Sequence, residues 1–384
     1  MEGTLLMERV QVTYSGSPVF NKDNTFTKDK DVVQGKSFSS NTTKLLKHLD
    51  KLQSIQEGKP ASPVMAHISL INACNLTCSF CCFANRDMTE RLPLDKVKQA
   101  LDSFKKIGVT GVEFTGGGEP TLHPDFEEIA RYTKSLGFGM GICTNGALIG
   151  KDRKIKQDIV ELFDWVRLGM YGFYEGYEYD LSVFEGIKTK PSAAYVWDEN
   201  LDTSENPNIT GEWTDSKKKR LSKKFQTREN FIRMLDWIEE KEIPCRIAFN
   251  AIKDVKETEK DIETIRNVIA EYEKDRGKKL QHAFLSDFNF KGERRNDHCY
   301  MHMVKPFLFT DGYIYVCPSA ELSIENNYNY VPDSQFMVCD IDGIEEFYTN
   351  PPTRRHHACH YCKYAMQNEL IDDILTETEH NQFA

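Results

Sequence analysis

The sequence predicts an α/β protein, a partial (βα)6 TIM-like barrel followed by a small C-terminal domain that contains a β-hairpin and a helix. From residue 64 onwards, short apolar runs with strand character alternate with segments in which apolar residues recur at helical spacing. Strands that alternate with helices form parallel βα units with right-handed crossovers, and six such units make an incomplete barrel. We therefore expect an N-terminal extension, the barrel and the C-terminal domain at residues 1–62, 63–290 and 291–384.

The predicted elements follow one another in a regular order. A short strand is predicted at residues 8–14, and a helix at residues 43–56 is expected to pack on the outside or the end of the barrel. The six barrel strands are predicted at residues 64–71, 109–114, 138–143, 165–170, 245–252 and 282–288. The helices between them are predicted at residues 93–107, 124–136, 155–163, 227–240 and 257–272.

One predicted connection is much longer than the others. Residues 172–224, between the fourth strand and its helix, are rich in Tyr, Asp, Glu, Asn and Lys and end in a basic run that starts at Lys217. A long loop at the C-terminal end of a barrel strand can form a lid over the substrate. The alternative is a surface insertion with a solvated charge run, and the sequence leaves both open.

Composition narrows the class of protein. The chain has 384 residues, a net charge of −10 and 11 cysteines, which are clustered rather than spread as a disulfide framework. The negative charge argues against a nucleic-acid polymer as partner, because backbone binding needs clustered Lys and Arg. No apolar run approaches the length of a membrane span, and the start of the chain lacks a signal-peptide pattern. We therefore expect a cytoplasmic protein with no membrane partner, whose thiols stay free to bind metal.

Three cysteines with a C-x3-C-x2-C spacing follow the first predicted strand. They are Cys74, Cys78 and Cys81. The spacing does not place three sulfurs on one face of a helix or strand, but it suits a loop around one metal centre. Three thiolates can hold three irons of a [4Fe-4S] cluster and leave the fourth iron open for a cofactor or substrate. A zinc site is the alternative, because paired cysteine motifs also bind zinc.

A second motif, Thr-Gly-Gly-Gly-Glu-Pro at residues 115–120, follows the second predicted strand. With the two motifs in this order, and with the aromatic Phe80 just before Cys81, the sequence resembles the radical S-adenosylmethionine (radical SAM) enzymes. The resemblance implies that Cys74, Cys78 and Cys81 ligate a [4Fe-4S] cluster whose open iron binds SAM. It also implies that an electron from the cluster cleaves SAM to a 5′-deoxyadenosyl radical, which takes a hydrogen atom from the substrate.

The resemblance implies further contacts to SAM, and the glycines would let backbone approach a ligand closely. The implied residues are Gly117, Gly118, Glu119, Asn145 at the end of the third strand, Arg167 on the fourth strand and Asn250 on the fifth, the last a contact to SAM or to the substrate. The fourth strand departs from the R-x-S-x-D pattern of many members, because Gly169 and Tyr171 replace the Ser and the Asp. Gly169 leaves room for a larger ligand, and Tyr171 is a candidate catalytic residue that faces it.

The C-terminal region carries a second set of cysteines. Residues 299–317 read C-x12-G-x4-C around a predicted hairpin at residues 307–317, and C-x2-C follows at residues 359–362. This pattern resembles the small "twitch" form of the SPASM extension of radical SAM enzymes. The resemblance implies one auxiliary [4Fe-4S] cluster, making two clusters in all, and a structural zinc knuckle is the alternative. The implied auxiliary ligands are Cys299, Cys317, Cys359 and Cys362.

Four cysteines remain. Cys339 lies in an apolar run, residues 336–341, that is typical of a core strand, and such a thiol is usually inert packing. A sharper hypothesis makes Cys339 a catalytic thiol that donates a hydrogen atom to a substrate radical. Cys82, Cys143 and Cys245 are interpreted as structural.

Three functions are compatible with these patterns. We expect a radical SAM enzyme that acts on a small molecule of the sugar, nucleoside or nucleobase type, because the first 60 residues lack a strand-rich winged-helix pattern for binding a leader peptide. The alternatives are an enzyme that epimerises or crosslinks a ribosomal peptide, and a non-catalytic zinc or Fe-S protein, which has no need of the glycine motif. Either enzyme requires an electron donor such as flavodoxin or ferredoxin.

Overall fold

The structure is a computed structural model that describes most of the chain from residue 42 to residue 376. The described ranges are 42–76, 78, 80–81, 83, 86–175, 177–197, 228–249, 255–285, 292–293, 298–319, 336–350, 356–357, 361–362 and 364–376. The predicted strand at residues 8–14, Asn250 and Cys359 therefore lie outside the described residues.

A curved sheet of ten strands forms the body of the molecule, in the order β12-β11-β10-β1-β2-β3-β4-β5-β6-β7. Strands β1 to β7 pair in parallel along this order, and β7 and β12 are the two edges, so the sheet is not closed. This arrangement confirms the predicted α/β class and the partial barrel. The parallel strands are β1 (Met65–Ile68), β2 (Gly111–Phe114), β3 (Gly139–Thr144), β4 (Trp165–Gly169), β5 (Lys190–Trp197), β6 (Cys245–Phe249) and β7 (Ala283–Leu285).

Strand β5 corrects the predicted strand count, because it lies inside the segment expected to be an insertion. It pairs with β4 on one side and β6 on the other, so seven parallel strands replace the predicted six. Its outer face is apolar, since Tyr195 and Trp197 pack their rings against Phe231, 5.4 and 4.7 Å away between ring centroids. The short helices η3 (Met170–Glu175) and η4 (Ser182–Phe184) precede β5. The basic run and the rest of the expected insertion, residues 198–224, lie outside the described residues.

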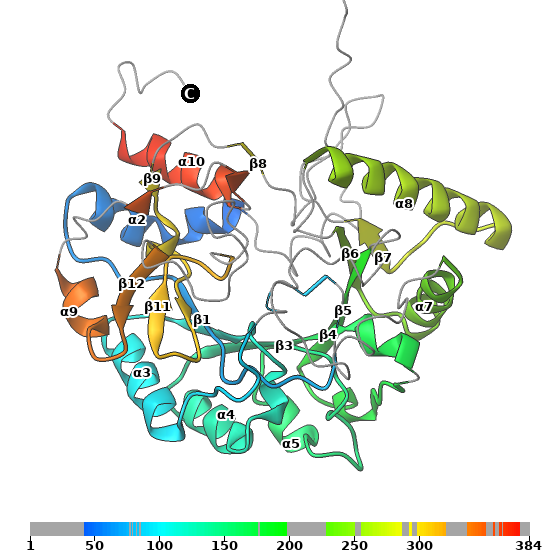
Figure 1. Ribbon diagram of the computed structural model, residues 1–384, viewed down its shortest axis with the longest axis horizontal. Helices are drawn as coiled ribbons and strands as arrows, with labels where there is room; N and C mark the ends of the chain where they lie inside the picture. Colours follow the sequence, from blue (N-terminus) through cyan, green and yellow to red (C-terminus); the bar gives the residue numbers. More distant parts are fainter. Residues whose placement is uncertain are drawn as a thin grey trace, which may run out of the picture.

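Helices cover the outer face of the sheet as the sequence predicts. Figure 1 shows five of them in an arc around the strands: α3 (Leu94–Lys106), α4 (Phe126–Ser135), α5 (Gln157–Val160), α7 (Arg228–Lys241) and α8 (Val255–Arg276). The predicted N-terminal helix is present as η1 (Thr42–His48) and α2 (Leu49–Gln56). Lys51 on α2 donates hydrogen bonds to the carbonyls of Pro63 (3.0 Å) and Gly108 (3.2 Å), just before β1 and β2. The helix therefore packs at the end of the barrel where the strands begin.

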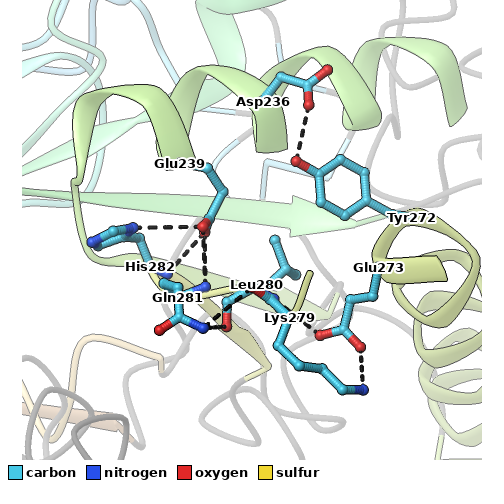
Figure 2. A network of polar contacts seen from close by, with 8 residues as sticks. All are labelled: Asp236, Glu239, Tyr272, Glu273, Lys279, Leu280, Gln281 and His282. Carbon is cyan, nitrogen blue, oxygen red and sulfur yellow. Dashed lines mark hydrogen bonds and ion pairs between the residues drawn. The ribbon is translucent and has the colours of Figure 1, made fainter. Parts of the chain in front are cut away.

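Helix α7 is also tied to the start of β7, as Figure 2 shows. Glu239 accepts hydrogen bonds from the backbone N–H groups of Gln281 (3.1 Å) and His282 (2.8 Å). Tyr272 of α8 donates a hydrogen bond of 2.9 Å to Asp236 of α7. These contacts fix two outer helices and the edge strand relative to one another.

The C-terminal region extends the same sheet. The predicted hairpin is confirmed as β10 (Phe307–Leu308) and β11 (Tyr313–Tyr315), and Gly312 takes the left-handed conformation (φ 83°) in its turn. Strand β10 pairs in parallel with β1, and β12 (Met337–Asp340) follows β11 at the edge. The remaining elements are β8 (Gly292–Glu293), β9 (His298–Cys299), η6 (Met301–Met303), α9 (Ile344–Thr349), β13 (His356–His357), β14 (Tyr361–Cys362) and α10 (Ala365–Leu375).

The two faces of the barrel sheet differ in chemistry. Phe114 of β2 packs against Phe126 of α4, with ring centroids 6.3 Å apart, so this face is the outer one. In β2 and β4 the outward residues are buried, whereas the inward Glu113, Trp165 and Arg167 are half-buried. Side chains alternate between the faces of a strand. The concave face is thus a polar surface that water reaches in part.

Candidate active site

Two loops meet at the C-terminal ends of β1 and β2. The loop after β2, which carries the glycine motif, runs beside the loop after β1, which carries the first three cysteines. The backbone N–H groups of Thr115, Gly118 and Glu119 donate to the carbonyls of residues 68, 71 and 73, at 3.1, 2.7 and 2.9 Å. The glycine motif therefore continues the pairing of the two strands past their ends.

The glycines are required by this docking. A Cβ atom on Gly118 would lie 2.6 Å from the carbonyl carbons of Asn72 and Ala73 and closer still to the Ala73 oxygen. Gly117 has a left-handed backbone (φ 58°), and a Cβ atom there would lie 2.7 Å from the side-chain oxygen of Asn72. We expected close backbone approach at these glycines, and the structure shows that the neighbour approached is the cysteine loop itself.

Glu119 joins this pair of loops to the end of β3. Its buried carboxylate accepts hydrogen bonds from the N–H (3.2 Å) and hydroxyl (2.6 Å) of Thr121, the hydroxyl of Thr144 (2.6 Å) and the N–H of Asn145 (2.6 Å). Burial raises the pKa of Glu119, and these donors oppose the rise. The Asn145 side chain in turn donates to the Asn75 side-chain oxygen at 2.6 Å. The predicted site residues Glu119 and Asn145 are thus brought together beside the cysteine loop.

N–H donors point at two of the three half-buried thiols, Cys74 and Cys81. The N–H of Leu76 donates to Cys74 Sγ at 3.4 Å, and Arg86 Nη1 donates to Cys81 Sγ at 3.4 Å. Burial raises the pKa of Cys74 to about 11, whereas Leu76 and Arg86 favour its thiolate. Hydrogen bonds to sulfur are among the means by which proteins stabilise and tune Fe-S clusters. The donor set therefore fits an Fe-S centre. Within the described ranges, no three His, Cys, Asp or Glu side chains are grouped to hold a single metal ion.

The second set of cysteines has a similar environment. Cys299, Cys317 and Cys362 are buried, and Cys362 Sγ accepts from the N–H of Tyr364 at 3.2 Å. Cys317 Sγ accepts from the N–H two residues on at 3.4 Å, as Cys74 and Cys362 do. Fully buried Asn368 donates to Cys362 Sγ (3.9 Å) and accepts from the backbone N–H of Tyr300 (2.7 Å), next to Cys299. The structure thus brings Cys299 and Cys362 to one side chain.

The concave face below the first cysteine loop carries charged residues that the sequence analysis missed. His67 Nε2 lies 3.4 Å from a carboxylate oxygen of Glu113, and Cys143 Sγ donates to the other oxygen at 3.3 Å. Burial alone would raise the pKa of Glu113, but the charges of His67 and Arg167 lower it. Arg246 of β6 also faces this side. The sequence signal that could have indicated this charged face is the presence of charged residues within predicted strands, at positions whose side chains share one face.

Tyr171 lies between this face and the cysteine loop. Its ring centroid is 4.7 Å from that of Phe80. A Cβ atom on Gly169 would lie 2.7 Å from the Tyr171 ring. The room that we expected Gly169 to leave for a ligand is therefore filled by Tyr171. Burial and the neighbouring Cys78 raise the pKa of Tyr171, which keeps the phenol protonated.

The strand register places Cys339 on the opposite face. Cys339 pairs with Ile314, which pairs with Leu308, which pairs with the outward Ile68. Cys339 is therefore on the helix side of the sheet, whereas Arg167 and Cys143 share the concave side. This register favours the packing interpretation of Cys339 over the hydrogen-atom donor.

Part of the chain is similar in sequence to known proteins. Residues 68–178 match the Radical SAM superfamily. The chain is 33% identical over 98 residues to an S-adenosylmethionine-dependent nucleotide dehydratase from Selenomonas ruminantium, which covers 26% of this chain and 35% of that protein. It is 32% identical over 95 residues to a PqqA peptide cyclase from Rhodopseudomonas palustris, covering 24% of each. The matched region thus spans about a third or less of the length of these relatives.

Among solved structures, the chain is similar to Streptococcus suis SuiB bound to S-adenosylmethionine, with 18% identity, coverage of 84% of this chain and 75% of that one, and a TM-score of 0.43. None of the helices in the described part of the chain is both long and apolar enough to cross a membrane. The matched residues include both the cysteine loop and the glycine motif that docks on it. The part of this chain that matches the Radical SAM superfamily, residues 68–178, thus contains the candidate site.

Proposed function

We propose that this protein is a radical SAM enzyme whose [4Fe-4S] cluster is held by Cys74, Cys78 and Cys81. These thiolates would hold the cluster, which in its reduced form would supply the one electron needed to cleave the S–C5′ bond of SAM to methionine and a 5′-deoxyadenosyl radical, the species that would take a hydrogen atom from the substrate. The observation that carries the proposal is the docking of the glycine motif on the cysteine loop, made by two short backbone hydrogen bonds at Gly118 and Glu119.

The residues of the site have different proposed roles. The N–H groups that point at Cys74 and Cys81 favour their thiolate forms. The Glu119 carboxylate holds Asn145 in place, and we propose that Asn145 and the backbone of Gly117 and Gly118 contact SAM. Tyr171, packed on Phe80, excludes water from the space between the cysteine loop and the concave face. Arg167 and Asn250 keep their predicted roles as ligand contacts.

A second cluster is proposed at the C-terminal set. Cys299, Cys317 and Cys362 are buried, and two of them accept a backbone N–H two residues on. With Cys359 they would make the four thiolates of a closed auxiliary [4Fe-4S] cluster. A reduced flavodoxin or ferredoxin is the proposed electron donor.

We propose a small molecule of the sugar, nucleoside or nucleobase type as the substrate. One relative is named as a nucleotide dehydratase. Another relative is named for a peptide substrate, so a ribosomal peptide is the second candidate. The charged concave face favours a polar substrate.

Anaerobic reconstitution tests the proposal. The wild-type protein is expected to bind about eight irons, and a Cys74/Cys78/Cys81→Ala variant about four. With dithionite and SAM, the wild type should form 5′-deoxyadenosine and the triple variant none. The matched control is Cys339→Ala, which should keep both the iron and the SAM cleavage. A colourless, zinc-rich wild type, or SAM cleavage that persists in the triple variant, contradicts the proposal.

A further inference from the structure

The concave face holds two arginines: Arg167, already proposed as a ligand contact, and Arg246, which has been given no role so far. Arg167 is on β4 and Arg246 is on β6, and β5 lies between them. Neighbouring strands are about 4.8 Å apart, so the two backbones are separated by about 10 Å. Two guanidinium groups at this separation can reach a group bound between them.

The residues that lie on the sheet between the two arginines have small side chains. Arg167 pairs with Ser192 of β5, and Arg246 pairs with Ala194 of β5, which pairs in turn with Gly169 of β4. All three small residues are inward by the same register. Arg167 is half-buried, whereas Nε and Nη1 of Arg246 are buried. Because the Tyr171 ring covers Gly169, Ser192 and Ala194 form the floor between the two arginines.

The charge of this face is positive. Among the inward positions of β1 to β7, all of which the structure describes, Glu113 is the only carboxylate. Glu113 is shared with His67 and Cys143 at 3.4 and 3.3 Å. Burial and the positive charge of Arg167 lower the pKa of Arg246 to about 10, so the two guanidinium groups repel each other while both stay charged at neutral pH. An anion between them would relieve that repulsion.

The space between the arginines lies close to the cysteine loop. Tyr171 packs on Phe80 of the loop, and its electrostatic neighbours include both Cys78 and Arg246. A group held by the arginines would therefore lie across Tyr171 from the proposed cluster. The rest of the same molecule could extend towards the loop, where the radical would form.

We infer that Arg167 and Arg246 bind an anionic group of the substrate, a carboxylate or a phosphate, on the floor formed by β5. The inference rests on the proposed function, because it assigns the ligand to the substrate of that site. Guanidinium groups recognise both anions through paired N–H donors, which a lysine cannot reproduce. Arg246 is then a specificity-determining residue that sequence comparison with the R-x-S-x-D pattern does not single out.

Anion binding to the reconstituted protein tests this inference without turnover. Inorganic phosphate and acetate are titrated separately by calorimetry at constant ionic strength, with chloride as the balancing anion. The wild type should bind one of them saturably at one site per chain. Arg246→Gln and Arg167→Gln should each weaken that binding 10- to 100-fold, since a hydrogen bond to a charged group is lost. Stronger binding of phosphate assigns a phosphorylated substrate, and stronger binding of acetate assigns a carboxylate.

Three controls make the result specific. Arg266→Gln, on the exposed side of α8, should bind the anion as the wild type does. Arg246→Lys keeps the charge and should show an intermediate loss, which separates recognition from failure to fold. The change that SAM causes in the electron paramagnetic resonance spectrum of the reduced cluster should persist in Arg246→Gln.

Three outcomes overturn the inference: no saturable anion binding to the wild type, unchanged binding in Arg246→Gln, or loss of the SAM-induced spectral change in that variant. The last would assign the arginine to the SAM carboxylate instead. Failure of the proposed function is distinguishable, because it appears as absent iron or absent SAM cleavage in the wild type, whereas the anion titration needs neither.

Discussion

Replacing Gly118 by alanine should separate the two loops that build the site. The added Cβ atom would lie 2.6 Å from two carbonyl carbons of the cysteine loop, whereas ordinary contacts begin near 3.4 Å, so the backbones must move apart by about 1 Å. That movement breaks the hydrogen bonds from the N–H groups of Gly118 (2.7 Å) and Glu119 (2.9 Å). Two such bonds contribute about 2 kcal/mol, and residual strain adds about 1 kcal/mol, so we expect a loss of about 3 kcal/mol.

The assay is urea unfolding of the reconstituted protein, with iron content measured on the same samples. We expect a lower unfolding midpoint and loss of about half of the iron, because only the first cysteine set is disturbed. Gly186→Ala is the control. Gly186 has a left-handed backbone (φ 73°) with no atom within 4 Å of an added Cβ, so alanine there should cost only about 1 kcal/mol and keep the iron. Wild-type stability and iron content in Gly118→Ala would refute the reasoning.

Three further predictions concern single side chains. A hydrogen bond from Arg276 lowers the pKa of Asp236, so the stabilising contribution of the Asp236 carboxylate is present above about pH 4 and is lost as pH falls through the lowered pKa. Asp236→Asn should therefore lower the urea midpoint at pH 7, and the midpoints of the variant and the wild type should become equal in acid. A difference in midpoint that stays constant with pH would contradict this. Asn368→Asp replaces an N–H donor to Cys362 Sγ by an acceptor, which should make the auxiliary cluster's potential about 40 mV more negative in a redox titration. An unchanged potential would contradict the effect assigned to this hydrogen bond, and the absence of a second redox transition in the wild type would argue against the second cluster. Cys339→Ala should cost about 1 kcal/mol in urea unfolding and leave the rate of 5′-deoxyadenosine formation unchanged, and a slower rate at wild-type stability would revive the hydrogen-atom donor.

Much of the fold could be predicted from periodicity. Helices such as α3 and α4 bury one stripe of apolar residues, and glycines end both, so their positions follow from spacing alone. Strand β5 could not be predicted in this way. Its apolar residues lie in a long polar stretch, and what makes it a strand is pairing with β4 and β6 and packing of Tyr195 on Phe231 of α7. Such contacts are distant in sequence, and local patterns do not report them.

The candidate site shows the same division. Cys74, Cys78 and Cys81 could be singled out because their spacing carries the chemistry. The roles of the glycines and of Glu119 could not, since they depend on which loop lies beside which. Glu119 is a charged residue that the sequence suggests as a ligand contact, yet four protein donors occupy its carboxylate. Arg246 was not predicted, because a single arginine in a strand does not by itself indicate a site. The strand pairing is needed to show that Arg246 lies beside Ala194 and on the same face as Arg167.

The open sheet explains why a charged concave face is tolerated. In a closed (βα)8 barrel, inward side chains fill the interior in packed layers, and an ionised group there loses its hydration at a cost of several kcal/mol. Here the sheet stays open between β7 and β12, although the rings of Trp165 and Tyr171 cover the inward Gly141 and Gly169. Glu113 and Arg167 therefore keep part of their water. A bound anion would replace that water with direct hydrogen bonds. The open sheet therefore lowers the desolvation cost of the charged groups and also leaves them accessible to a ligand.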